Sequence, residues 1–232
     1  MKLRIIFNNT DLATVLPDTA LYIGNVTGRE FVSPDVTTVA YKGAHGSRFV
    51  GNRYPARDIQ VEVTVIGYCF QMMPSYASKL MSVLATDVPA SLSFSDQEGT
   101  YQAIVSAIDL EEHETYARGT ITFTCPDPYR YGEAQQVDLA ETIRIDTNCT
   151  ILPVLTFTAT GKPSITVNGE TLSIDKTLTG GVIDSQHNQV MDNGNNLLVA
   201  EVSGVFPLLR DVNHIETENI SGGQFRYLMR WL

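Results

Sequence analysis

The sequence predicts a mainly β protein with two β-sandwich domains, the first of which carries one packed α-helix. Several short segments alternate apolar and polar residues, and one segment of 12 residues places its apolar side chains at helical spacing. The chain has 232 residues, whereas single domains commonly span roughly 100 to 200 residues. Two modest domains therefore fit this chain better than one.

Strands are predicted wherever apolar residues recur at every second position. In RDIQVEVTVIGY the aliphatic residues from Ile59 to Val65 share one face, and SLSFSD repeats the pattern. ITVNGETLSI places Asn168-Gly169 between two apolar runs, which predicts a hairpin because a type I′ turn needs positive φ at both central residues. QFRYLMRWL alternates in the same way, so we expect a closing strand over 224–232.

One helix is predicted over residues 75–86. Tyr76, Leu80 and Leu84 recur at intervals of four residues and form an apolar stripe. Ser75 is a suitable N-cap because its hydroxyl can accept a hydrogen bond from the first turn. A helix of about three turns is marginal on its own in water, so we expect it to lie on a sheet.

The stretch TITFTCPDPYRYG begins as a strand and is then interrupted by two prolines. Proline donates no backbone hydrogen bond and keeps the preceding residue extended. We therefore predict an inter-domain connector, made of Pro126, Asp127, Pro128, Tyr129 and Tyr131. The domains are then 1–130, with the helix, and 131–232, although the final strand, 224–232, could return to the first domain. An ordinary surface turn after a strand is the alternative.

No motif for catalysis or metal binding is complete. HETYA lacks the second histidine of H-E-x-x-H, and DNGNN has glycine where a calcium loop needs an oxygen ligand. Asp184, Ser185 and His187 are close in sequence, but at this spacing on a strand we expect their side chains to point to different faces. We therefore expect no enzyme activity, no metal and no cofactor.

Composition argues against several classes of partner. The formal net charge of −10 disfavours a surface that grips nucleic acid. The apolar runs are too short for a membrane span, so we expect no membrane contact. The three cysteines are widely spaced and predict neither a zinc site nor a disulfide framework. We expect them to be small core residues in a reducing compartment: Cys69, Cys125 and Cys149.

Residues 42–57, KGAHGSRFVGNRYPAR, gather four basic residues and three glycines in an otherwise acidic chain. The basic residues are Lys42, Arg48, Arg53 and Arg57. Long loops without secondary structure of their own are usually functional, and arginine pairs well with carboxylates. We predict that these residues cross a boundary between subunits, with a solvated loop as the alternative.

Taken together, these segments resemble a known family. GTITFTCPDPYRYG is similar to the mid-chain signature of the distal tail proteins of phages with long, non-contractile tails, and YPARDIQVEVTV is similar to that family's Arg-Asp-Ile strand opening. GGVIDSQHNQVMDNGNN, SGVFPLLRDVNHIE and FRYLMRWL resemble its C-terminal half, so the resemblance covers most of the chain. Asp211-Val212 departs from the pattern, because many members have Pro-Gly there, although Asn213 and Ile215 are retained.

The resemblance implies a structural virion protein of a siphophage or prophage. It implies a ring, usually a hexamer, which the first β-sandwich forms between the tail tube protein and the tail tip. A second, galectin-like sandwich would face outward as a docking platform for a receptor-binding protein. DNA would pass through the lumen without specific binding, and the protein would be assembled in the cytoplasm of the bacterial host. The alternative is a carbohydrate-binding module that attaches to the host surface.

Overall fold

The computed structural model describes residues 3–17, 20–43, 45–67, 69–192 and 194–232. The chain divides into two compact units, one ending at Arg130 and the other spanning Tyr131–Trp231. Each unit has its own cluster of buried hydrophobic residues. Strands dominate both units, which confirms the prediction of a mainly β protein.

The first unit contains nine strands, one long helix and two single-turn helices within the described residues. They are β1 (Ile5–Phe7), β2 (Thr10–Asp11), α1 (Leu12–Val15), β3 (Leu21–Thr27), β4 (Asp35–Val39), β5 (Arg48–Arg53), β6 (Arg57–Ile66), η1 (Phe70–Met72), α2 (Met73–Leu84), β7 (Ala90–Phe94), β8 (Gln97–Glu112) and β9 (Tyr116–Cys125).

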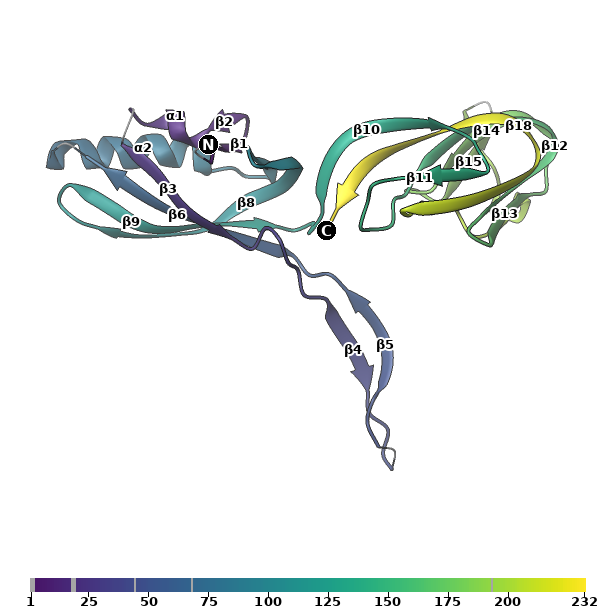
Figure 1. The fold of residues 1–232 in the computed structure, drawn as a ribbon, viewed down its shortest axis with the longest axis horizontal. Helices are drawn as coiled ribbons and strands as arrows, with labels where there is room; N and C mark the ends of the chain where they lie inside the picture. The colour runs from purple at the N-terminus through teal and green to yellow at the C-terminus, as the bar shows by residue number, and fades with distance from the viewer. Residues whose placement is uncertain (1–2, 18–19, 44, 68, 193) are drawn as a thin grey trace. The chain divides into compact units, whose positions relative to one another are not determined.

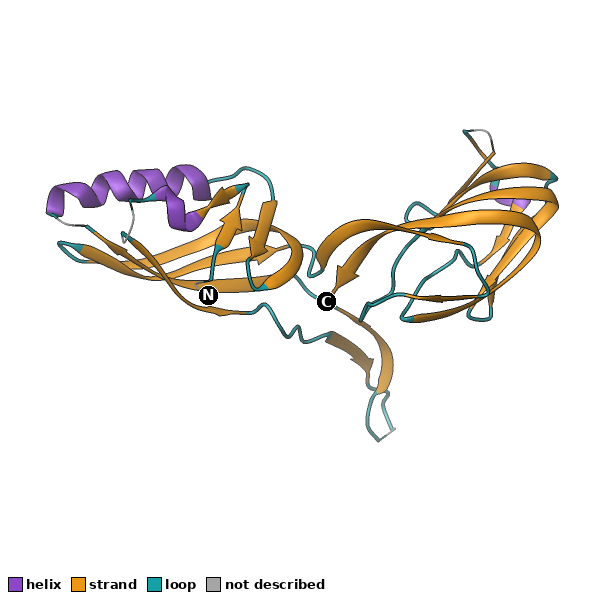
Figure 2. Cartoon of the chain, turned by 45° about the horizontal axis from the view of Figure 1, so that its top comes forward, coloured by secondary structure: helices purple, strands orange, loops and turns teal. Residues whose placement is uncertain are grey.

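Seven strands of this unit form one antiparallel array in the order β2, β1, β7, β8, β9, β6, β3. Strands β4 and β5 pair with each other as a separate ribbon. Figure 2 shows α2 lying across one face of the array. The Tyr76, Leu80 and Leu84 stripe of α2 is buried in the same cluster as the strands, so the predicted packing of the helix on a sheet is confirmed.

The core of the first unit follows from the period of its strands. β6 alternates buried and exposed positions, and Ile59, Val61 and Val63 are at most 2% exposed. On the neighbouring strand, Ile121 and Phe123 are fully buried on the same side. Full burial of such a side chain contributes roughly 1.5 to 3 kcal/mol, so this face accounts for much of the stability of the unit.

The helix begins two residues before the predicted start. Its first residue is Met73, and Met72 at the N-cap makes no side-chain hydrogen bond, so Ser75 lies inside the first turn and does not cap it. Pro74 occupies the first turn, where its fixed φ is favourable and its missing N–H costs nothing. The prediction of the cap was wrong because it overlooked this proline signal.

The second unit contains nine strands and one short 3-10 helix among its described residues. They are β10 (Arg130–Asp138), β11 (Thr142–Arg144), β12 (Val154–Val167), β13 (Glu170–Ile174), β14 (Leu178–Asp184), β15 (Gln189–Asp192), β16 (Asn195–Asn196), η2 (Val199–Glu201), β17 (Val202–Gly204) and β18 (Val212–Trp231).

Two long strands, β12 and β18, run through both layers of this unit (Figure 1). Their halves near Leu155 and Phe225 pair in the layer that contains β14 and β15. Their other halves, near Ile165 and Thr217, pair in the layer that contains β13 and β17. Register shifts between 158 and 164 mark the bend where the pair passes from one layer to the other, a common device in β-sandwiches.

The predicted hairpin in this unit is confirmed. Val167 pairs with Glu170, and Asn168 and Gly169 have φ of 54° and 86°. Residues 224–226 pair with β12, and the chain groups with the second unit as far as Trp231, whereas Leu232 groups with the first unit. The turn at Asp211-Val212 needs no glycine, because neither residue has a positive φ.

The three cysteines differ in exposure. Cys125 is buried, Cys149 is half-buried, and Cys69 is exposed, so the expectation of a core position was wrong for Cys69. Burial raises the pKa of the Cys125 thiol to about 12. Cys125 is therefore a structural residue and remains protonated at neutral pH.

Candidate functional site

The first unit carries a two-stranded ribbon, which we call the arm and define as the described part of residues 31–54. Its strands β4 and β5 pair from Asp35 with Arg53 to Val39 with Arg48, with a register shift in between. Among the described strands, these two pair only with each other. The segment 42–57, which we expected to lack secondary structure, therefore contains β5 and the first residue of β6.

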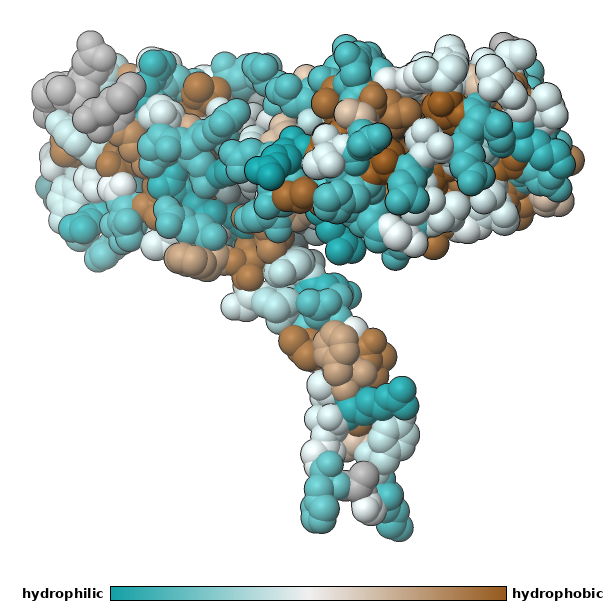
Figure 3. Space-filling model, turned by 45° about the vertical axis from the view of Figure 1, so that its right-hand side comes forward, coloured by the Kyte–Doolittle hydropathy of each residue, from teal (hydrophilic) through white to brown (hydrophobic). Residues whose placement is uncertain are grey.

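Both faces of the arm are exposed. Every residue of β4 is exposed, and five of the six residues of β5 are as well. The arm and its base nevertheless carry large hydrophobic side chains on the surface, some of which are visible in Figure 3. These are Phe31, which is 91% exposed, and Val36, Val39, Tyr41, Phe49, Val50 and Tyr54.

A two-stranded ribbon with both faces exposed is unusual in a protein that remains monomeric in water. An isolated hairpin is marginally stable, and its unpaired edges and apolar side chains promote association. Exposed hydrophobic residues gathered in one segment mark interaction sites more often than ordinary surface. The arm is therefore the strongest candidate for a contact surface in the first unit.

Three of the four predicted basic residues lie on this arm. Lys42 is in the turn, and Arg48 and Arg53 are at the two ends of β5, all exposed. The Nε atom of Arg53 lies 3.5 Å from a carboxylate oxygen of Asp35. Both side chains are more than half exposed, so this ion pair contributes little to stability. The charge of the arm is thus available to a partner.

Arg57 is different, and its expected role in a subunit contact is corrected. It is only 3% exposed, and its Nη1 donates hydrogen bonds to the carbonyl oxygen of Arg29 at 2.5 Å and to the hydroxyl of Tyr101 at 3.1 Å. Its guanidinium also lies 5.3 Å from the centre of the Tyr101 ring. Because a buried guanidinium must be held by such partners, Arg57 is a structural residue at the start of β6.

The predicted connector lies between β9 and β10, except for Tyr131, which is the second residue of β10. β9 ends at Cys125 and β10 begins at Arg130, so the two prolines fall in the gap between strands. The carboxylate of Asp127 accepts a hydrogen bond from the backbone N–H of Tyr129 at 3.1 Å, which closes a local turn. Tyr131 is the first residue of the second unit.

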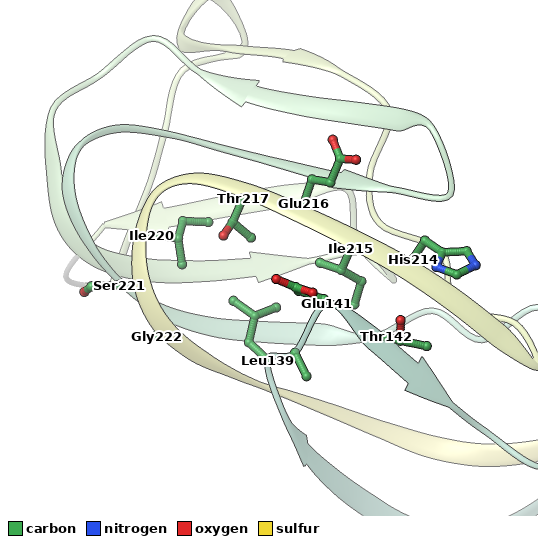
Figure 4. Close-up of a pocket in the computed structure, with 11 residues that line it drawn as sticks. Leu139, Glu141, Thr142, His214, Ile215, Glu216, Thr217, Ile220, Ser221 and Gly222 are labelled. Atoms are coloured by element: carbon green, nitrogen blue, oxygen red, sulfur yellow. The ribbon is translucent and has the colours of Figure 1, made fainter.

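A hollow of about 710 Å³ opens beside β11 and β18 in the second unit (Figure 4). Its lining includes the carboxylates Glu141 and Glu216, the ring of His214 and several hydroxyl groups. Of the residues that the structure describes, no phenylalanine, tyrosine or tryptophan lines it. A sugar could find hydrogen bonds here but no aromatic face on which to stack.

The structure brings together two members of the Asp184, Ser185 and His187 set. The Nδ1 atom of His187 lies 2.8 Å from Asp184, because the residues after Asp184 form a turn and do not continue the strand. Burial acts to raise the pKa of Asp184, but hydrogen bonds from His187 and from two backbone N–H groups lower it below its ordinary value. The expectation that these side chains point apart was wrong for this pair, although the buried hydroxyl of Ser185 has no hydrogen-bond partner and completes no triad.

Other chemical centres are not evident in the part of the chain that the structure describes. Within those residues, no group of three or more His, Cys, Asp and Glu side chains could hold a metal ion. In the same residues, no helix is long and apolar enough to cross a membrane. The DNGNN stretch includes residue 193, which lies outside the described residues.

Asn213 has a structural role, and in the sequence it stood out only because it is retained in the family pattern. It is fully buried, and its carboxamide makes four hydrogen bonds. Its oxygen accepts from Arg210 N at 2.7 Å and from the side chain of Asn168 at 3.2 Å, and its nitrogen donates to the carbonyl oxygens of Arg210 and Ile143. A single amide therefore joins β11, the 168–169 turn and the start of β18.

Comparisons with known proteins agree with this architecture. Residues 21–125 match the family described as "Phage tail protein RIFT-related domain". The solved structure of the SPP1 Dit protein, described as a paradigm of the hub adsorption apparatus in phages that infect Gram-positive bacteria, matches with a TM-score of 0.75 and 16% identity over 100% of both chains.

Weaker matches are found to the phage P2 baseplate in its activated conformation. The form with calcium has a TM-score of 0.38 and 9% identity, over 99% of this chain and 98% of that chain. A comparison with curated protein sequences finds no match. The resemblance to siphophage distal tail proteins is confirmed: residues 21–125 match the phage tail protein RIFT-related domain, and the chain as a whole has the fold of the SPP1 Dit protein.

Proposed function

We propose that this chain is a distal tail protein that forms a ring, most simply a hexamer, between the tail tube protein and the tail tip of a siphophage. The first unit forms the ring. The second unit offers a docking platform for a receptor-binding protein. The protein acts in the virion tail, after assembly in the cytoplasm of the bacterial host, and it catalyses no reaction.

The observation that carries this proposal is the agreement of the fold with SPP1 Dit over the full length of both chains, together with the tail domain at 21–125. The arm supports it independently, because a ribbon with exposed aromatic and aliphatic side chains is expected to be covered in an assembly. In a ring of identical copies, a neighbouring copy can cover the arm of each chain.

The ring must also let DNA pass. Each phosphate gripped by Lys or Arg would add a salt-dependent hold on the duplex. The chain has 26 acidic and 16 basic residues, and three of the basic ones lie on the arm. We therefore expect the lumen to be acidic or neutral, and we expect the wild-type ring not to bind duplex DNA tightly even at low salt.

The test of the ring is the mass of the purified protein by light scattering, with negative-stain images of the particles. We expect about six copies per particle, and a monomer at all concentrations would refute the ring. Replacing Arg48 and Arg53 by alanine should weaken assembly, most visibly at high salt if the remaining contacts are also ionic. The matched control removes two exposed arginines of the second unit, Arg144 and Arg226, and should assemble normally.

The domain boundary is proposed at 130–131, and trypsin offers a test. The exposed basic residues of the arm and the connector at 126–131 are the expected sites of cleavage, because irregular or weakly packed exposed backbone is cut first. Cleavage at the connector should leave a stable fragment of about 100 residues, the usual size of a small domain. A single protected core with no cleavage at either place would contradict this division.

The alternative function is carbohydrate binding by the second unit, and the hollow in Figure 4 is where it would occur. Among the described residues, its lining includes no phenylalanine, tyrosine or tryptophan, which disfavours this function. Calorimetry with host-wall sugars should detect no binding. Micromolar affinity that is lost on replacing Glu141 and Glu216 by alanine would favour the alternative.

A further inference from the structure

A groove of about 310 Å³ lies between the start of α2 and the β8–β9 hairpin in the first unit. Its floor is apolar and includes Met73 and Leu80 of α2, Val65 of β6 and Leu110 of β8. A cavity of about 150 Å³ can hold a benzene ring, so the groove has room for about two aromatic side chains.

The rim of the groove is acidic. Glu112 and Glu114 line it at the tip of the β8–β9 hairpin, and both are exposed. Glu111 is in the same tip, but it faces Arg118 across the strand pair and lies 3.5 Å from His113. The carboxylates of Glu112 and Glu114 therefore give the rim its net negative charge.

The arm has the complementary composition. Phe49 and Tyr41 are 60% and 58% exposed, which supplies aromatic side chains for an apolar floor. Lys42 and Arg48 lie next to these residues in sequence and are exposed. Among the carboxylates on the arm itself, Asp35 is near Arg53, which leaves Lys42 and Arg48 for charges elsewhere.

The strand register places the arm and the groove at opposite ends of the sheet. The arm joins the end of β6 at Arg57, whereas the groove includes Val65, eight residues further along the same strand. At a rise of roughly 3.3 Å per residue this separation is about 26 Å. One copy thus presents an arm at one end and an acidic, apolar groove at the other.

We infer that the groove receives the arm of a second copy of this chain, with Phe49 or Tyr41 on the apolar floor and Lys42 and Arg48 facing Glu112 and Glu114. This inference rests on the proposed ring and names the surfaces that would close it. A contact between two different surfaces of identical copies is head-to-tail, and such contacts form rings when the rotation closes.

A charge exchange within one chain tests the contact, because every copy in a ring supplies both surfaces. The groove variant Glu112→Arg with Glu114→Arg should raise the concentration for half-assembly at least tenfold, and so should the arm variant Lys42→Glu with Arg48→Glu. The chain with all four substitutions should recover most of the loss. The matched control, Glu216→Arg with Glu218→Arg in the second unit, should assemble as wild type. Circular dichroism checks that each variant is folded.

A photo-crosslink locates the contact without altering any charge. With Phe49 replaced by p-benzoylphenylalanine, irradiation should join two chains, and mass spectrometry should find the bond at residues 73–80 or 110–117. Crosslinks elsewhere, normal assembly of the groove variant, or no recovery in the four-fold variant would each overturn the inference while leaving the ring intact. A wild-type protein that never assembles would instead refute the ring itself.

Discussion

Replacing Asn213 by alanine should destabilise the second unit strongly and leave the first unit unchanged. The side chain is fully buried, and all four hydrogen-bonding positions of its amide are used. The change leaves the carbonyl oxygens of Ile143 and Arg210 and the Arg210 N–H without this partner. Each lost hydrogen bond costs about 1 kcal/mol, so the free energy of unfolding should fall by about 3 to 4 kcal/mol.

Urea unfolding followed by tryptophan fluorescence measures this cost in one unit alone. Trp231 is the chain's single tryptophan and lies in the second unit, where its indole N–H donates to the carbonyl oxygen of Asp146 at 3.2 Å. For a small domain with a urea slope of about 1.5 to 2 kcal/mol per molar, the midpoint should fall by about 2 M.

The neighbouring residue provides the control for this experiment. His214 is on the same strand but exposed, so His214→Ala should move the midpoint by less than about 0.3 M. A shift below about 0.5 M for Asn213→Ala would show that the loop rearranges or that water replaces the amide. The description of Asn213 as the joint between β11, the 168–169 turn and β18 would then be wrong.

Three further outcomes are expected. Gly28→Ala should destabilise the β3–β6 pair by roughly 3 kcal/mol or more, seen as faster hydrogen exchange there, because Gly28 has a φ of 83° and an added Cβ would lie 2.0 Å from a carbonyl oxygen of β6. The hydrogen bond from Arg29 lowers the pKa of Asp96 below its ordinary value of 3.8. The Asp96–Arg29 pair therefore stabilises the first unit above pH 3.8, and this stabilisation is lost as the pH falls through the lowered pKa. With Asp96→Asn, the melting temperature of the first unit should change less between pH 5 and pH 3 than it does in the wild type. In a thiol-labelling assay at pH 8, Cys69 should react at once, whereas Cys125 should react only on unfolding; rapid labelling of both would contradict the buried position of Cys125.

Local patterns were sufficient for most strands and for the interior of the helix. The run from Ile59 to Val65 has a period of two because a strand with one buried face requires it, and the structure buries those residues. Asn168-Gly169 was predictable because few residue pairs adopt positive φ twice in succession. Each of these signals lies within a dozen residues and needs no knowledge of the rest of the chain.

The position of Arg57 was not predictable from its neighbours in sequence. Next to Lys42, Arg48 and Arg53 it looks like one member of a basic loop, yet it is buried against Tyr101. The two residues are 44 positions apart, and only the pairing of the strands brings them together. A charged residue is rarely buried without partners, and these partners are visible only in the tertiary structure.

The strands of the arm were also not predicted. Residues 42–57 were interpreted as a loop, and hydrophobic residues on short strands are normally buried, so an exposed ribbon was not predicted. The structure leaves them exposed because β4 and β5 pair only with each other among the described strands. No local pattern distinguishes a strand that packs within its own domain from one that stays exposed.

The charge of the arm explains how copies of so acidic a protein could associate. At a net charge of −10, identical chains repel one another at long range, and association needs a local contact of opposite sign. At physiological salt the screening length is about 8 Å, so distant repulsion is reduced while contacts at close range persist. Lys42 and Arg48 provide positive charge on a segment that also carries Tyr41 and Phe49. The hydrophobic residues would supply most of the affinity, and the basic residues would select an acidic groove as the place where they bind.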